Sequence, residues 1–117
     1  MKTLNKQSEN RGLLVLSLVG LFIFFNSSCS SNSAPPANEV FIQGMAFSPA
    51  TLTVAVGTTV KWTNKDGVAH TVTSDTGLFD SQNVNANGVF SYMFMTAGTF
   101  NYHCTIHPTM VAKIIVK

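Results

Sequence analysis

The chain has 117 residues, of which 45% are hydrophobic and 10% are charged, and its formal net charge is +2. That length suits a single domain. From residue 39 onward four lysines are balanced by four acidic residues, so the basic excess lies in the N-terminal third and nothing in the charge pattern indicates nucleic-acid binding.

The first 28 residues have the pattern of a secretory signal peptide. A basic head with Lys2, Lys6 and Arg11 precedes an apolar run at 12–25, and small polar residues follow it. The run is shorter than the ~20 residues that a membrane-spanning helix needs, although a retained membrane anchor is the alternative. We therefore expect the rest of the chain to be exported, to the periplasm or the cell surface.

The end of this segment resembles a bacterial lipoprotein cleavage site, in which Cys29 would carry a lipid that anchors the protein to a membrane. Asn26 stands where an aliphatic residue is usual in such sites, so ordinary cleavage that leaves a free Cys29 is the alternative. The next residues lack aromatic and β-branched side chains, which is typical of a flexible tether. The predicted organisation is a signal peptide at 1–28, an anchor and tether at 29–38, and a folded domain at 39–117.

The folded domain shows the period-two alternation of β-strands and no convincing helical period. Runs of β-branched and aromatic residues alternate with turn formers such as Ser48-Pro49, Asp66-Gly67 and Asn87-Gly88. The predicted strands are 39–43, 51–56, 59–64, 69–74, 89–95, 98–104 and 111–116. About seven short strands at this spacing indicate an all-β sandwich or barrel.

The core is expected between the strands, with Leu78 and Phe79 pinning the irregular segment 75–88. Its predicted members are apolar residues of the strands and of one turn: Phe41, Phe47, Leu52, Val54, Val60, Trp62, Val72, Phe90, Tyr92, Phe94, Phe100, Tyr102 and Ile114.

One short segment concentrates metal-binding side chains. Cys104, His107 and Met110 follow one another at intervals of three residues between two predicted strands, and His70 supplies a second imidazole from another strand. A tight loop would let the first three converge on one ion. Two imidazoles and a thiolate in a trigonal plane, with a weak axial thioether, describe a blue-copper electron-transfer site. A closed structural zinc site would use more thiolate or imidazole and no thioether.

These motifs resemble the cupredoxin, or blue-copper, family, above all its small plastocyanin-like and amicyanin-like members. The resemblance covers residues 39–117 and rests on the stretches AFSPATLTVAVGTTVKWTN, AHTVTSD, FDS and GTFNYHCTIHPTM. It implies a Greek-key β-sandwich of about seven to eight strands and one copper ion that cycles between Cu(I) and Cu(II). It also implies redox partner proteins as donor and acceptor, and a monomer that carries electrons rather than an enzyme.

The resemblance further implies which residues support the ligands. Both ligand histidines would bind through Nδ1. Asn64 would brace the ligand loop, and Thr71 and Thr105 would lie beside the ligands. Thr71 stands where several members have Asn, so the hydrogen bonding near the sulfur of Cys104 is left open.

The resemblance also places an electron port at His107, with Met45, Ile106 and Pro108 as an apolar docking patch around its edge. His103 adjoins Cys104, so on a strand its side chain points to the opposite face. We expect a surface or packing role for it, with a part in electron exit as the alternative.

Two other functions are open on the sequence. Copper capture or delivery at the cell envelope would need an exchangeable ion, which a tight site with four ligands disfavours. A redox accessory domain of a larger oxidase or reductase would need a fixed partner. Catalysis by the chain itself is not expected, because neither an open coordination position nor an acid–base pair is visible.

Overall fold

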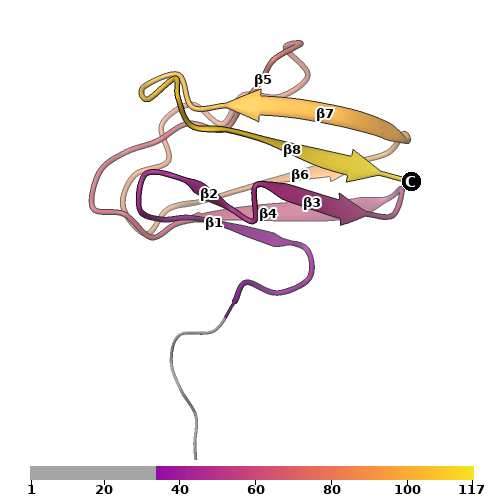
Figure 1. Cartoon of the computed structure of the whole chain (residues 1–117), viewed down its shortest axis with the longest axis horizontal. Helices are drawn as coiled ribbons and strands as arrows, with labels where there is room; N and C mark the ends of the chain where they lie inside the picture. The colour runs from indigo at the N-terminus through magenta and orange to yellow at the C-terminus, as the bar shows by residue number, and fades with distance from the viewer. Residues whose placement is uncertain (1–33) are drawn as a thin grey trace, which may run out of the picture. The chain divides into compact units, whose positions relative to one another are not determined.

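The structure is a computed structural model that describes residues 34–117. The predicted signal peptide and Cys29 lie outside the described residues. The described part forms two four-stranded sheets, seen as two layers in Figure 1, and within it no helix is long and apolar enough to cross a membrane. The predicted all-β sandwich of about seven to eight strands is confirmed, with the strands β1 (Glu39–Ile42), β2 (Phe47–Ser48), β3 (Thr51–Val54), β4 (Thr58–Asn64), β5 (Thr73–Ser74), β6 (Val89–Phe94), β7 (Gly98–His103) and β8 (Val111–Val116).

Each sheet combines parallel and antiparallel pairs. The first has the order β2-β1-β4-β6, with β1 parallel to β4, and the second has the order β3-β8-β7-β5, with β3 parallel to β8. β7 and β8 are antiparallel, with His103 opposite Val111, so the loop 104–110 closes one end of the sandwich. β1 and β4 also end at this side, whereas β1 begins and β8 ends at the opposite side.

Aromatic rings fill the space between the two sheets. The alternation along β4 buries Val60, Trp62 and Asn64 and exposes the residues between them to differing degrees. Trp62 packs against the rings of Phe79 and Tyr102, with centroids 6.0 and 5.5 Å away. Phe79 pins the irregular segment 75–88 as predicted, but Leu78 is 45% exposed and does not.

The predicted inward face of β1 is wrong by one residue. Val40 and Ile42 are fully buried, whereas Phe41 is only half-buried and lies under the Nζ atom of Lys65, 4.4 Å from its ring centroid. All three residues are apolar, so the alternation could not choose between the two faces.

The predicted strand 69–74 is shorter than expected, since only Thr73 and Ser74 form β5. The preceding residues bond to an irregular segment instead: the backbone groups of His70 and Val84 exchange two hydrogen bonds, and Val72 accepts one from the backbone N–H of Ser81. His70 is therefore held by an isolated bridge to Val84 rather than within a regular ladder.

Candidate metal centre

The antiparallel pair β7–β8 positions the ligand loop. Cys104 follows the last residue of β7, and its backbone N–H donates to the carbonyl of Met110 at 3.1 Å. The backbone N–H of Met110 in turn donates to the carbonyl of His107 at 2.9 Å. These two bonds fold residues 104–110 into a compact turn, with Pro108 fixing one φ angle within it.

Three predicted ligand residues meet at one point. Sγ of Cys104 lies 3.8 Å from Nδ1 of His70 and 3.8 Å from Nδ1 of His107, and the two nitrogens are 3.2 Å apart. A point equidistant from the three atoms then lies about 2.1 Å from each. Bonds from zinc, a comparable divalent ion, measure ~2.0–2.1 Å to imidazole and ~2.3 Å to thiolate. The three side chains therefore fit a single metal ion.

Burial sets the character of this site. Cys104 and His70 are fully buried, and His107 is half-buried. Met110, the expected fourth ligand, is 4% exposed and belongs to the same buried cluster as Cys104. Three of the four candidate ligands are thus shielded from solvent, and the site reaches the surface only at His107.

Thr71 joins the segment of His70 to the ligand loop. Its backbone N–H donates to Sγ of Cys104 at 3.3 Å. Its hydroxyl accepts the backbone N–H of Thr105 at 2.8 Å and lies 3.1 Å from the hydroxyl of Thr105. Thr71 and Thr105 are therefore next to the ligands, and the sulfur receives a hydrogen bond although Asn is absent at position 71.

Asn64 is buried, but its hydrogen bonds do not reach the ligand loop. Its amide donates to the carbonyls of Val68 and Val84, and its Oδ1 accepts the backbone N–H of Asp66. The expectation that Asn64 braces the loop 104–110 is therefore corrected: Asn64 braces the turn before His70, and Thr71 makes the contact with the loop.

Asp66 is the site residue that the sequence did not indicate. Its Oδ2 atom lies 2.9 Å from Nε2 of His70, the ring nitrogen that does not face Cys104. In the sequence it stands in a Lys-Asp-Gly stretch that reads as a turn. An acidic residue four positions before a candidate ligand histidine was the available signal.

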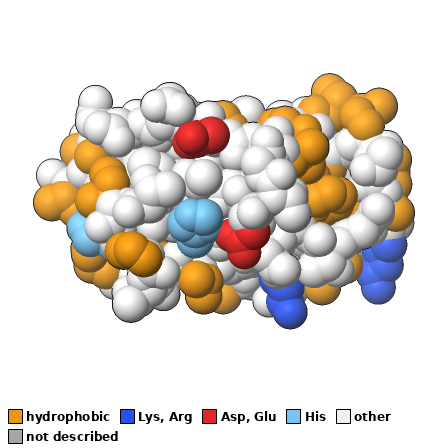
Figure 2. Space-filling view, turned by 90° about the horizontal axis from the view of Figure 1, so that it is seen from above, with side chains coloured by type: hydrophobic (Ala, Val, Ile, Leu, Met, Phe, Trp, Pro, Cys, Tyr) orange, Lys and Arg blue, Asp and Glu red, His pale blue; other side chains and the backbone are white. Residues whose placement is uncertain are grey.

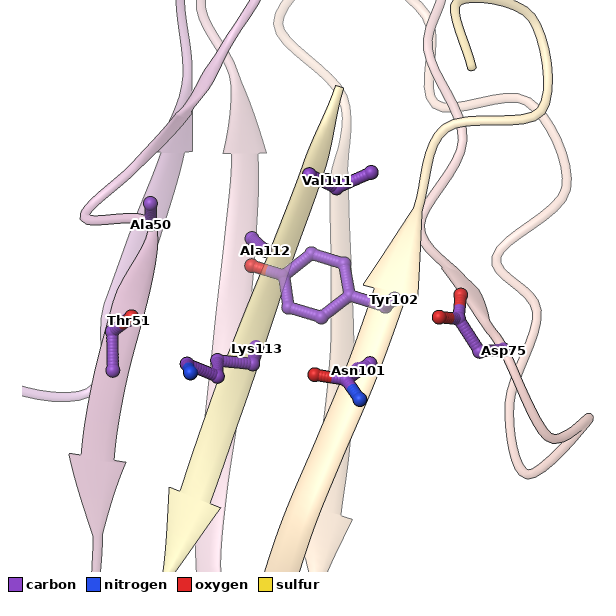
Figure 3. A pocket seen from close by; sticks show the side chains of 8 residues that line it. All are labelled: Ala50, Thr51, Asp75, Asn101, Tyr102, Val111, Ala112 and Lys113. Carbon is purple, nitrogen blue, oxygen red and sulfur yellow. The ribbon is translucent and has the colours of Figure 1, made fainter. Parts of the chain in front are cut away.

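His103 lies on the outer side of the sheet β3-β8-β7-β5. Its Nδ1 atom is 2.6 Å from Oδ1 of Asp75, and a view onto this sheet has a histidine between acidic side chains (Figure 2). An open depression of about 350 Å³ on the same face is lined by residues that include Thr51, Asp75 and Lys113 (Figure 3). None of the ligand candidates lines it, so it is separate from the metal centre.

Comparison with known proteins gives a consistent result. The cupredoxin-like domain family matches residues 14–116. Amicyanin of Paracoccus denitrificans is 34% identical over 89 residues, which cover 72% of this chain and 68% of amicyanin. The chloroplastic plastocyanin of Tetradesmus obliquus is 31% identical over 106 residues, covering 80% and 73%. The structure of a mutant of amicyanin in its Cu(I) form superposes with a TM-score of 0.66 at 33% identity, covering 74% of this chain and 87% of that one.

Proposed function

The chain belongs to the cupredoxin-like family, and from this premise we propose that it is a blue-copper electron carrier whose one copper ion is held by His70, Cys104, His107 and Met110. Its work is the transfer of single electrons between redox partner proteins, without catalysis of its own.

The observation that carries this proposal is the triangle formed by Sγ of Cys104 and the two Nδ1 atoms. Two imidazoles and one thiolate at these separations would hold a copper ion, and the buried thioether of Met110 in the same loop would be the fourth ligand. When bound, copper supplies a one-electron couple between Cu(I) and Cu(II).

The chain's own residues keep the ligands in place. The hydroxyl of Thr71 ties the loop to the segment of His70, and the bridge to Val84 ties that segment to the body of the fold. Ligands held from several sides in a packed interior change position little. A small rearrangement between two oxidation states keeps the barrier to electron transfer low.

His107 is the proposed electron port, because it is the one ligand candidate that reaches the surface. Met45 and Ile106 are 47% and 44% exposed, and Pro108 is exposed as well. Hydrophobic side chains surround a histidine at the left end of the molecule in Figure 2. A small apolar surface of this kind favours brief contact with a partner protein.

We further propose that the protein is exported and held at a membrane by a lipid on Cys29, and that it works as a monomer. Labelled palmitate given to cells producing the full chain should appear on the protein, and globomycin or Cys29→Ala should remove the label. An unlabelled wild-type protein would eliminate the anchor without affecting the copper site.

The copper proposal is tested by absorption and EPR spectra of the copper-loaded full chain. We expect an intense visible band from thiolate-to-copper charge transfer and reversible one-electron cycling. Cys104→Ser should abolish the band, because the thiolate is its source, and leave a weak ordinary copper site. A colourless Cu(II) form of the wild-type protein would contradict the proposal, and fast transfer of copper to an acceptor protein would favour delivery instead.

A further inference from the structure

The carboxylate of Asp66 lies behind the buried imidazole of His70. Its Oδ2 atom is 2.9 Å from Nε2, while Nδ1 of the same ring faces Sγ of Cys104. The side chain of His70 is fully buried and that of Asp66 is 16% exposed. The imidazole is therefore held between a carboxylate on one side and the other ligand candidates on the other.

Backbone amides fix the carboxylate itself. The N–H groups of Gly44 and Met45 donate to its two oxygens at 2.7 and 3.0 Å. Both residues have positive φ, 67° and 62°, in a turn that presents successive amides to one anion.

This arrangement determines where the proton of His70 lies. An ionised carboxylate only accepts hydrogen bonds, so a bond between Asp66 and Nε2 requires the hydrogen on Nε2. A neutral imidazole that carries its hydrogen on Nε2 has a free lone pair on Nδ1. Nδ1 is the nitrogen that faces Cys104 and His107.

We infer that Asp66 is a positioning residue of the metal centre: it fixes the tautomer and ring orientation of His70, and its negative charge favours the oxidised ion. The effect on the oxidised ion rests on the proposed function, whereas the tautomer of His70 can be examined in the chain without metal. Carboxylates behind metal-bound histidines raise the basicity of the ligand, and their loss typically costs 10–100-fold in metal affinity. The oxidised ion carries one more positive charge than the reduced ion, so the carboxylate lowers the reduction potential.

The variant Asp66→Asn removes the charge and leaves too few acceptors for three N–H groups. Asp75→Asn is the matched control. It makes the same change of charge at a second histidine–aspartate pair, in which Oδ1 of Asp75 lies 2.6 Å from Nδ1 of His103. His103 precedes Cys104 in the chain but is not itself a ligand candidate. Both variants are made in the full chain and are measured with and without copper.

In the metal-free wild type, ¹⁵N NMR should find the His70 hydrogen on Nε2 and in slow exchange with water. Asp66→Asn should make that hydrogen exchange faster, and Asp75→Asn should not. With copper, Asp66→Asn should bind the ion 10–100-fold more weakly. It should also shift the equilibrium between oxidised and reduced forms about tenfold toward the reduced form, which is ~59 mV for one electron.

A hydrogen on Nδ1 of His70 in the wild type would overturn the inference even if Asp66→Asn failed to fold. Equal potentials and affinities for Asp66→Asn and Asp75→Asn would overturn it as well, while leaving the blue-copper function intact. A wild-type protein without the charge-transfer band would remove the function, and the NMR result on the metal-free chain would then decide the positioning role by itself.

Discussion

The hydroxyl of Thr71 is the most informative group to remove, because it joins two segments that each carry proposed metal ligands. It accepts the backbone N–H of Thr105 at 2.8 Å and lies within 3.0–3.1 Å of the hydroxyls of Thr73 and Thr105. One donor and two acceptor positions are thus all in use. Thr71→Val has nearly the same shape and deletes all three bonds, while the backbone N–H that donates to Sγ of Cys104 stays.

The expected cost follows from what the change leaves unpaired. The donor left without a partner is the backbone N–H of Thr105, whose bond is only part-buried, so the cost lies near the lower end of the ~1–3 kcal/mol of a fully buried donor. For a loss of ~1 kcal/mol in the free energy of unfolding, the melting temperature of the metal-free protein should fall by roughly 4–8 °C for a domain of this size. The charge-transfer band of the copper-loaded protein should persist, because the sulfur keeps its hydrogen bond.

Thermal unfolding monitored by circular dichroism gives the stability, and hydrogen exchange gives the protection of the Thr105 amide. Thr73→Val is the control, because it removes one hydroxyl from the same network without touching the ligand loop. If Thr71→Val had the melting temperature of the wild type and left the Thr105 amide equally protected from exchange, the loop would not be held through this hydroxyl.

Three further perturbations test other parts of the molecule. Phe79→Ala should lower the free energy of unfolding by about 3–5 kcal/mol in chemical denaturation, because the ring packs against several core aromatics; a cost below ~1 kcal/mol would mean that it does not pin segment 75–88. The buried hydroxyl of Tyr102 lies near the indole N–H of Trp62 but does not meet the geometry of a hydrogen bond, so Tyr102→Phe should leave stability unchanged or raise it by ~1 kcal/mol. Burial raises the pKa of Tyr102 above its usual range, so above pH ~10 the unfolded chain loses this proton before the folded one does and the free energy of unfolding falls as the pH rises further. Tyr102→Phe should weaken this alkaline loss of stability in pH titrations. Ile106→Lys should slow electron self-exchange between two copies at least about tenfold at low salt by charge repulsion, without changing the visible spectrum, and an unchanged rate would exclude this surface as the contact.

The candidate ligand residues could be selected from the sequence because their chemistry is rare and their spacing is local. Cys104, His107 and Met110 lie in one loop between two strands, so short-range geometry brings them together. His70 could be proposed from its residue type alone, and its placement depends on the bridge to Val84, which no periodic pattern indicates. The convergence of the two segments is a property of the tertiary fold.

The parts that the sequence did not predict have identifiable physical causes. Three successive apolar residues in β1 leave the inward face undetermined, so Phe41 was assigned to the wrong side. Asp66 could be recognised as a turn residue, but its hydrogen bond to His70 depends on where the turn after β4 lies in space. Long-range polar contacts of this kind leave no periodic trace in the sequence.

The direction of the first and last strands determines how the protein can be attached to anything else. β1 enters the sandwich, and β8 leaves it, at the end remote from His107. A linker joined before Glu39 or after Lys117 would therefore leave the proposed electron port at His107 uncovered. A copy immobilised on an electrode through either terminus should present that port to the solution, whereas attachment through an engineered cysteine near Pro108 should block it.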